Sequence, residues 1–222
     1  MPGDDTPAPR SFPLALEEPV AFEVNGAAAA TLLCTPRDLD VLALGWLFAR
    51  GAISSIDDVG SIRVEGNAVR VETRCGQGAP PVRTPRSGGR FPLASIRAWV
   101  REMFDRADLR ASVGGGMHSA GLADGTGLRW AYEDVGRHNA VDKVIGRGLA
   151  ERCDFARCCL LCSGRIAVEM AAKAIAAGIP VFASRSIPTT AAFGMAVEKG
   201  LTMVGRAASE SPIVYTSPER VS

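Results

Sequence analysis

One cysteine of the chain lies in a segment whose composition favours reactivity. Cys75 belongs to the stretch RCGQGAPPVRTPRSGGR, residues 74–90, which concentrates glycine, proline and arginine. Nearby positive charge lowers the pKa of a thiol and so favours the nucleophilic thiolate. Loops of this length in compact chains are usually functional or disordered. We therefore expect Cys75 to be a nucleophile on a mobile loop covering about residues 74–92, with a passive loop cysteine as the alternative.

The other five cysteines occur in apolar or helix-end contexts. Cys158, Cys159 and Cys162 lie in CCLLC, where the leucines predict a buried strand. Residues three apart in a strand lie about 10 Å from each other, too far for a disulfide or a shared metal. Cys34 ends a predicted apolar strand, and Cys153 follows the end of a predicted helix. We expect both cysteines to have structural roles. We also predict no zinc site, because the deaminase pattern ending in Pro-Cys-x-x-Cys is absent.

A dense polar stretch, YEDVGRHNAVDKVIG at residues 132–146, precedes a helical pattern and could bind an anion. The first turn of a helix presents backbone N–H groups, and Arg137 and His138 would lie beside them. The alternative is a solvated turn with Asn139 near the N-cap. Upstream, Gly114-Gly115-Gly116-Met117-His118 supplies a close backbone approach and the only other histidine.

The short turn Ser163-Gly164-Arg165, between a predicted strand and a predicted helix, has the same potential. Glycine lets the backbone approach a ligand, the helix start favours negative charge, and arginine offers a planar fork to phosphate. Because three-residue motifs recur by chance, a merely structural turn is the alternative.

The elements that must position these residues begin with a smaller α+β unit over residues 12–110. Residues 1–11 are expected to be a disordered lead-in. Two hairpins turn at Asn25-Gly26 and Gly66-Asn67. Between them we expect a helix with Thr35 as N-cap and Pro36 at its first position, ending at Gly51. A further helix is predicted at about 93–107.

From Gly114 onward the pattern predicts a sheet covered by crossover helices, over residues 111–222. Strands at 158–162, 180–184 and 201–204 alternate with helices at 165–177 and 189–199, which end at Gly178 and Gly200. Ligands of such sheets bind outside the carboxyl ends of the strands. The loops there would be 163–165 and 185–190.

Composition limits the classes of function. The chain has 222 residues, 25 Lys and Arg against 24 Asp and Glu, and 47% hydrophobic residues. Balanced charge argues against a nucleic-acid partner and against a polybasic membrane surface. The first ten residues do not form a secretory signal, and no apolar stretch approaches the roughly eighteen residues of a membrane span. We expect a soluble, cytoplasmic protein.

The chain from about Pro19 to Val221 resembles the formate dehydrogenase accessory sulfurtransferase family (FdhD-like). The most specific match is EDVGRHNAVDKVIG at 133–146. Supporting matches are VNG at 24–26, TPRDLDVLALGWL at 35–47, GGGMHSAGL at 114–122, SGR at 163–165, EMAAKAIAAGIPV at 169–181, GLTMVG at 200–205 and VYT at 214–216.

The resemblance implies an α/β fold in which a cytidine-deaminase-like C-terminal domain joins the smaller N-terminal unit. It also implies a homodimer that accepts sulfur from a cysteine desulfurase. A persulfide on Cys75 would pass that sulfur to the molybdenum bis(molybdopterin guanine dinucleotide) cofactor before its insertion into the catalytic subunit of formate dehydrogenase. The positions implied to bind this cofactor are Gly115, His118, Asp134, Arg137, His138, Asn139, Lys143, Ser163, Gly164, Arg165, Ser186, Thr189, Gly205 and Arg206.

Two departures from the family pattern bear on this expectation. The family loop usually reads Cys-Gly-x-Cys-Gly, whereas Gly78 stands here at the second cysteine, so no internal disulfide can resolve a persulfide on Cys75. Arg206 follows Gly205 where an aromatic residue is usual. The alternative to a sulfurtransferase is a non-catalytic carrier that delivers the cofactor. A deaminase-like hydrolase is excluded by the missing zinc ligands.

Overall fold

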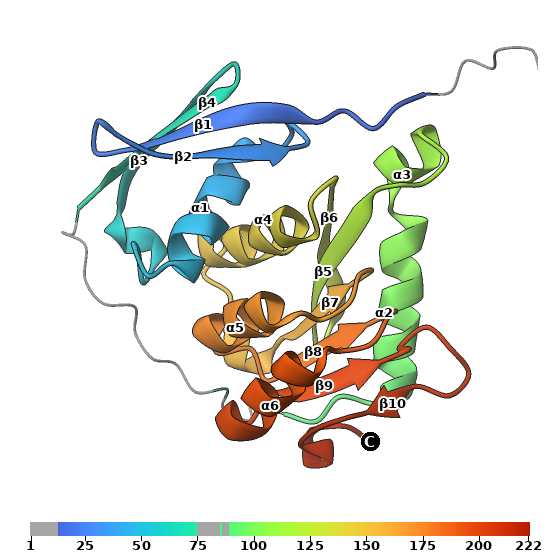
Figure 1. Ribbon diagram of the computed structural model, residues 1–222. Coiled ribbons are helices and arrows are strands. Elements are labelled where there is room, and N and C mark those ends of the chain that lie inside the picture. Colours follow the sequence, from blue (N-terminus) through green and yellow to red (C-terminus); the bar gives the residue numbers. More distant parts are fainter. Residues whose placement is uncertain (1–12, 75–84, 86–88) are drawn as a thin grey trace, which may run out of the picture.

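The computed structural model describes residues 13–74, 85 and 89–222, and Figure 1 shows a small sheet and a large sheet with helices between them. The small sheet has the strand order β2-β1-β4-β3. Its strands are β1 (Glu18–Val24), β2 (Ala27–Cys34), β3 (Val59–Glu65) and β4 (Ala68–Thr73). The predicted turns at Asn25-Gly26 and Gly66-Asn67 are confirmed as the links of two antiparallel hairpins, and β1 pairs with β4 in parallel.

The large sheet has the order β10-β9-β8-β7-β5-β6. Its strands are β5 (His118–Asp124), β6 (Gly127–Asp134), β7 (Cys159–Cys162), β8 (Val181–Ser184), β9 (Thr202–Gly205) and β10 (Ile213–Val214). The strands β7, β8 and β9 are parallel, as the β-α-β-α-β pattern predicts. Because β5 is antiparallel to β7, the start of β5 lies at the same edge as the carboxyl end of β7.

Helices cover both faces of the large sheet. The helices of the described residues are α1 (Leu39–Ala49), α2 (Leu93–Asp105), α3 (Asp108–Ser112), α4 (Arg137–Ala150), α5 (Val168–Ala177) and α6 (Thr190–Lys199), with short 3-10 turns η1 (Ile56–Asp58), η2 (Phe155–Arg157) and η3 (Pro218–Arg220). In Figure 1, α4 and α5 lie on the side facing the small sheet, while α2 lies on the opposite face. Every helix in the described part of the chain is too short or too polar to cross a lipid bilayer.

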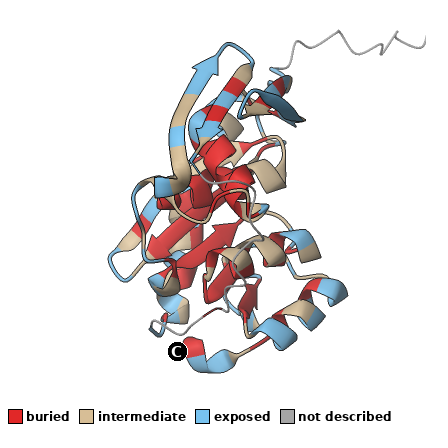
Figure 2. Cartoon of the chain, turned by 90° about the vertical axis from the view of Figure 1, so that its left-hand side faces the viewer, coloured by how far each residue is buried: buried red, intermediate tan, exposed pale blue. Residues whose placement is uncertain are grey.

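The two faces of the large sheet belong to two hydrophobic clusters. Along β7, Leu160 and Cys162 pack into the cluster shared with α1, α4, α5 and the small sheet. Cys159 and Leu161 point to the other face, in the cluster that contains α2. A strand buried on both faces requires this unbroken apolar sequence. Figure 2 shows the buried residues gathered in this interior and the exposed ones at the hairpins and outer helices.

The helices α1 and α4 cross at glycines. A Cβ atom at Gly45 would overlap the backbone oxygen of Asp142, and one at Gly146 would overlap that of Val41. The crossing joins the small sheet and its helix to the large sheet through one continuous core. The predicted boundary between residues 110 and 111 stays a prediction, although α2, which precedes it, packs on the large sheet.

Several predicted element limits are wrong. The helix α1 begins at Leu39 with Asp38 as N-cap, at φ 54°, rather than at Pro36 behind Thr35. The helix α5 begins at Val168 rather than Arg165, because Ile166 first forms a bridge with Pro188. The helix α2 ends at Asp105, before the separate helix α3.

Candidate functional site

The polar residues singled out in the sequence gather at one edge of the large sheet, where β7, β8 and β9 end and β5 begins. Ser163 follows β7 and is bound to β5 twice. Its N–H donates to the Ser119 oxygen at 2.9 Å, and its hydroxyl accepts from the Ser119 N–H at 3.0 Å. The same hydroxyl lies 3.4 Å from Nδ1 of His118. The loop after β7 and the first two residues of β5 therefore form one unit.

Hydrogen bonds continue along this edge to the end of β9. The Ser184 hydroxyl donates to the Gly164 oxygen at 2.5 Å and accepts from the Ser186 N–H at 2.9 Å. The Ser186 oxygen accepts from the Arg206 N–H at 2.7 Å. We call His118, Arg137, Ser163, Gly164, Arg165, Ser186 and Arg206 the strand-end cluster. Its backbone is held by hydrogen bonds from one parallel strand to the next, which gives a preorganised surface.

Arg137 joins the cluster from the first turn of α4. A Cβ at Gly164 would lie 3.4 Å from His118 Nδ1 and 3.6 Å from Arg137 Cδ, in ordinary van der Waals contact, so Gly164 lies directly beside both side chains. Nε of Arg137 is buried without a hydrogen-bond partner among the described residues. Burial and, next, the Arg137 charge lower the pKa of His118 below its usual value. His118 is therefore neutral at pH 7, beside a fixed cation that favours an anion.

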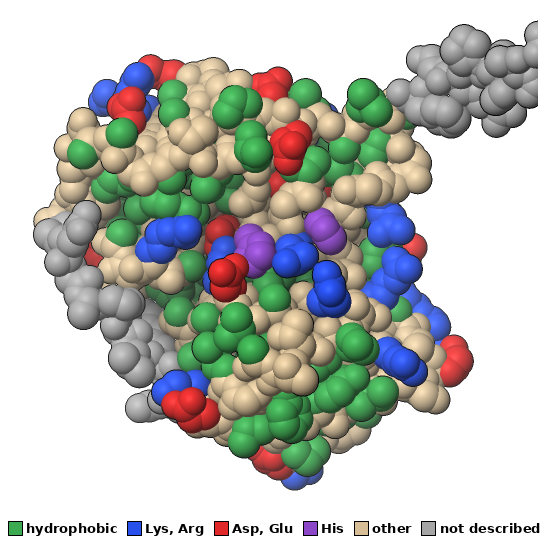
Figure 3. All heavy atoms as spheres, viewed as in Figure 1, with side chains coloured by type: hydrophobic (Ala, Val, Ile, Leu, Met, Phe, Trp, Pro, Cys, Tyr) green, Lys and Arg blue, Asp and Glu red, His purple; other side chains and the backbone are tan. Residues whose placement is uncertain are grey.

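Figure 3 shows both histidines of the chain on one face of the molecule, with Lys or Arg side chains beside them. The exposed arginines that follow the parallel strands are Arg165, Arg185 and Arg206, and Arg206 has φ 52°. Arg165 and Arg206 have no ion-pair partner among the residues with described placement. The carboxyl edge of the large sheet is thus cationic, as an anion site requires.

His138 lines a groove between α1, α4 and α5 that sequence reasoning missed. The groove has a volume of about 430 Å³ and is lined by Leu32, Trp46, Ala49, Arg50, His138, Asn139, Asp142, Glu169, Ala172 and Lys173. His138 Nε2 is 3.0 Å from Glu169 Oε2. Burial, followed by the charges of Lys173 and Arg137, lowers the pKa of His138. The sequence does contain a signal for this groove. His138 and Asp142 are four residues apart on one helix, and Glu169 and Lys173 have the same spacing on another.

Besides His138 Nε2, two buried polar atoms of the residues that line this groove have no hydrogen-bond partner among the described residues. Asp142 is 1% exposed, and its Oδ2 binds Lys173 Nζ at 2.6 Å while Oδ1 accepts no hydrogen bond from the described residues. Nε1 of Trp46 likewise has no acceptor among them. Burial raises the pKa of Asp142, and Lys173 opposes this effect. Asp142 Oδ1 and Trp46 Nε1 are thus a buried acceptor and a buried donor in the wall of the groove.

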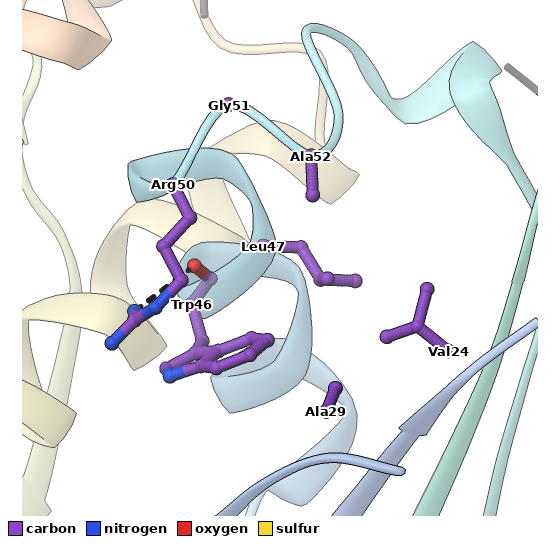
Figure 4. A pocket seen from close by; sticks show the side chains of 7 residues that line it. All are labelled: Val24, Ala29, Trp46, Leu47, Arg50, Gly51 and Ala52. Carbon is purple, nitrogen blue, oxygen red and sulfur yellow. Dashed lines mark hydrogen bonds between the residues drawn. The ribbon is translucent and has the colours of Figure 1, made fainter. Parts of the chain in front are cut away.

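An adjoining apolar hollow of about 310 Å³ shares Trp46 and Arg50 with the groove (Figure 4). The Arg50 guanidinium lies 4.1 Å from the centre of the Trp46 ring and donates to its backbone oxygen at 3.4 Å. In Figure 4 the remaining lining consists of aliphatic side chains and Gly51. Among the described residues, Arg50 is the one charged residue that lines the hollow, so we propose no chemistry there.

Three of the predicted cofactor-binding residues, Asp134, Asn139 and Lys143, are linked to one another through Asp134, and their predicted role toward the cofactor stays a prediction. Asp134 and Lys143 are completely buried and form an ion pair of 2.8 Å. Asn139 donates to Asp134 Oδ1 at 3.0 Å and to the Leu33 oxygen at 2.9 Å. Gly136 is the N-cap of α4, and Asn139 lies in its first turn rather than at the cap. These side chains hold the start of α4 in place beneath Arg137 and His138.

The remaining predicted residues lie along the same edge with structural partners. Gly115 adopts φ 134° in the loop before β5. Thr189 is the N-cap of α6, and its hydroxyl accepts from the Ala192 N–H at 3.2 Å. A Cβ at Gly205 would lie 2.7 Å from the Tyr215 ring, which explains why a glycine ends β9. Cys75, Gly78 and most of the loop 74–92 lie outside the described residues.

Neither metal-binding nor thiol chemistry appears within the strand-end cluster. The described residues contain no group of three or more His, Cys, Asp and Glu side chains able to hold a metal ion. Burial raises the pKa of Cys162, at the end of β7, to about 11. Its thiol donates to the Gly164 oxygen at 3.2 Å, so Cys162 supports the turn as an unreactive group.

The comparison with protein families decides the family. The model of the FdhD/NarQ family matches residues 15–84 and 78–222. The chain belongs to the FdhD/NarQ family. The family resemblance predicted from the sequence motifs is therefore confirmed, and the strand-end cluster is a feature of an FdhD/NarQ protein.

Curated relatives in the FdhD/NarQ family cover almost the whole chain. The chain is 35% identical to the sulfur carrier protein FdhD of Streptomyces coelicolor, over 99% of this chain and 92% of the relative. It is 34% identical to the protein of the same name from Sulfurisphaera tokodaii, over 86% and 84%. A crystal structure titled as a formate dehydrogenase accessory protein, from Desulfotalea psychrophila, superposes with a TM-score of 0.83 at 29% identity, over 93% of this chain and 89% of that one.

Proposed function

We propose that this protein is a sulfurtransferase that serves formate dehydrogenase as an accessory protein, with Cys75 as its sulfur carrier. The names of the relatives, sulfur carrier protein FdhD and formate dehydrogenase accessory protein, support this proposal. The family loop pattern places the sulfur carrier at Cys75, and burial raises the pKa of Cys34, Cys159 and Cys162 and makes these three poor nucleophiles.

The first chemical step is a sulfur exchange. The Cys75 thiolate attacks the outer sulfur of a persulfide on a cysteine desulfurase. The new S–S bond forms on Cys75, the S–S bond of the donor breaks, and the donor leaves as a thiolate. No electrons are gained or lost overall. With Gly78 in place of a second loop cysteine, no neighbouring thiol in that motif competes for the persulfide.

The acceptor that we propose is the molybdenum bis(molybdopterin guanine dinucleotide) cofactor, bound as cargo before its insertion into formate dehydrogenase. The strand-end cluster carries this part of the proposal. Phosphate groups suit a surface with preorganised backbone, exposed Arg165 and Arg206, and a buried Arg137 Nε without a partner. Asp134, Asn139 and Lys143 would position the site without contacting the cargo, because they are bound to one another.

The second candidate is a non-catalytic carrier that binds the same cofactor and delivers it. The observation that favours it is Gly78 at the position of the second loop cysteine. The carrier and the sulfurtransferase share the strand-end cluster and differ only in whether Cys75 carries sulfur.

We further propose a cytoplasmic homodimer whose large domain has a cytidine-deaminase-like arrangement. The order of β6, β5, β7, β8 and β9, with β5 and β7 antiparallel, supports the arrangement. Exposed Phe193 and Val197 on α6, with Ile187 before it, offer an apolar face for a second copy. Light scattering that gives a monomer mass across a wide concentration range would contradict the dimer.

The decisive experiment is mass spectrometry of the intact protein after incubation with a cysteine desulfurase and cysteine. We expect one added sulfur, located on the peptide that contains Cys75, and no added sulfur in Cys75→Ser. In cells that lack their own accessory protein, Cys75→Ser should fold but restore no formate dehydrogenase activity. If Cys75→Ser fully restores formate dehydrogenase activity, the proposed sulfurtransferase function is wrong, and the non-catalytic carrier becomes the better proposal.

A further inference from the structure

Two cysteines far from the strand-end cluster lie side by side at the other end of α4. Cys153 follows α4, and Cys158 precedes β7, with η2 between them. The turn is fixed locally: the Cys153 N–H donates to the Gly148 oxygen at 2.8 Å, and Asp154 caps η2 by accepting from the Ala156 N–H at 3.2 Å. This turn brings the two sulfur atoms to 3.8 Å.

One of the two thiols is accessible and the other is not. Cys158 is 1% exposed, whereas Cys153 is half-buried. Both line a hollow of about 550 Å³ on the surface, whose other lining residues include Asp124, Arg129 and Asp154. A small molecule that enters the hollow can meet Cys153, with Cys158 directly behind it.

The surroundings activate Cys153. The hydrogen bond with Cys158 is the largest influence, and together with the charge of Arg129 it lowers the pKa of Cys153 to about 7, against the effects of burial, Asp124 and Asp154. The same hydrogen bond and burial raise the pKa of Cys158. Arg129 is held in place by Asp124 at 2.8 Å. The pair therefore combines a nucleophilic thiolate with a protonated neighbour.

We propose that Cys153 and Cys158 are a redox-active thiol pair that a small disulfide, such as oxidised glutathione, converts to an intramolecular disulfide. The Cys153 thiolate attacks one sulfur of the small disulfide, whose S–S bond breaks and releases one thiolate. The Cys158 sulfur then attacks Cys153 Sγ and expels the second thiolate, which takes up the Cys158 proton. Two protein thiols are oxidised, and one small disulfide is reduced to two thiols.

Little movement is needed for this bond. The sulfur atoms must approach from 3.8 Å to a bond length of about 2.05 Å, which side-chain rotation at the half-buried Cys153 can supply. The pair is independent of Cys75 and of the proposed function. The sequence pattern indicated only Cys159 and Cys162 as a possible pair. Cys153 and Cys158 come together only through the turn that contains η2.

The test uses the full chain with Cys75→Ser, so that the loop thiol cannot react. The reduced protein is incubated with oxidised glutathione, remaining thiols are blocked with N-ethylmaleimide, and the tryptic peptides are analysed by mass spectrometry. Trypsin separates residues 153–157 from residues 158–165. We expect these two peptides to be joined by a disulfide that fragmentation assigns to Cys158, with no glutathione retained.

Two variants in the same background complete the test. Cys158→Ala should trap glutathione on Cys153 as a stable mixed disulfide, whereas Cys34→Ala, a buried cysteine on β2, should form the Cys153–Cys158 bond as the parent does. Glutathione retained on Cys153 in the parent protein, or a disulfide between residues 153–157 and Cys159 or Cys162, would overturn the proposal. So would a parent protein in which every described cysteine stays fully reduced.

Discussion

Asp134 at the end of β6 and Lys143 on α4 form an ion pair of 2.8 Å from which solvent is entirely excluded. Asp134 Oδ2 also accepts from the Thr35 N–H at 3.2 Å, and its Oδ1 accepts from the Gly136 N–H at 2.8 Å. Lys143 Nζ donates to the backbone oxygens of Thr35 and Glu133. The pair therefore joins the loop after β2, the end of β6 and the first turn of α4, from which Arg137 and His138 extend.

Asp134→Ala should be strongly destabilising. It leaves the Lys143 ammonium buried without its counterion, a change that typically costs about 3–5 kcal/mol. We expect the free energy of unfolding measured in urea to fall by about this amount. The double variant with Asp134→Ala and Lys143→Met should lose less than the sum of the single variants, because no unpaired charge remains. Additive losses would show that the two residues act separately.

Local sequence signals predicted those parts of the fold that depend on neighbouring residues. The turn at Asn25-Gly26 is confirmed, with left-handed φ values of 51° and 75°. Gly178 and Gly200 end α5 and α6 as predicted, at φ 75° and 69°. In each case the conformation is set by residues within one turn.

The sequence did not predict features that depend on contacts formed only in the folded chain. Thr35 resembles an N-cap, yet its hydroxyl accepts from the Val135 N–H at 3.2 Å, which draws it away from α1. The sequence also does not reveal that Lys143 is completely buried in an ion pair with Asp134, and its predicted role in cofactor binding stays a prediction. The edge that gathers His118, Ser163 and Arg206 was predictable in part, because carboxyl ends of parallel strands share an edge. The antiparallel placement of β5 was not.

The glycines at the crossing of α1 and α4 should tolerate no side chain. Gly45→Ala and Gly146→Ala each place a methyl group against a backbone oxygen of the other helix, which cannot move as a flexible side chain would. Overpacking of this kind typically costs about 1–3 kcal/mol. The thermal midpoint of both variants should fall clearly.

Gly194→Ala is the matched control, because it lies within α6 and a Cβ there meets no atom within 4 Å. Alanine is a better helix former than glycine by about 0.5–1 kcal/mol, so this variant should be as stable as the parent or more so. Equal midpoints for the Gly45, Gly146 and Gly194 variants would show that the crossing is loosely packed.

Both histidines should titrate below their usual pKa, and one substitution should raise both values. Burial is the main cause for His118 and for His138, and Arg137 adds to it in both cases. Arg137→Ala should therefore raise both pKa values, as measured by NMR titration of the ring protons. Arg165→Ala, which removes a nearby arginine not among these causes, is the control. A shift confined to one histidine would mean that Arg137 faces only that ring.

The same shifts predict how stability depends on pH. Because the folded pKa of each histidine lies below the unfolded value of about 6.5, the folded protein binds fewer protons than the unfolded chain just below that pH. The free energy of unfolding should thus be retained above pH 6.5 and fall as the pH decreases through the folded pKa values. Replacing both histidines with Gln should flatten this decline, as chemical denaturation at a series of pH values would reveal.

Binding of guanosine diphosphate should depend on the arginines of the carboxyl edge. Arg165→Ala removes a charge-assisted contact to phosphate, worth about 1.5–3 kcal/mol, so calorimetry should show affinity weakened about tenfold or more. Arg206→Ala tests the position where the family usually has an aromatic residue, and it should weaken binding if that arginine contacts phosphate.

Arg63→Ala is the control, because Arg63 is exposed on β3 in the small sheet and should leave binding unchanged. The Cys75→Ser protein should bind as tightly as the parent, since sulfur transfer and phosphate binding use different residues. Unchanged affinity in Arg165→Ala, with a folded protein, would remove this arginine from the proposed phosphate site.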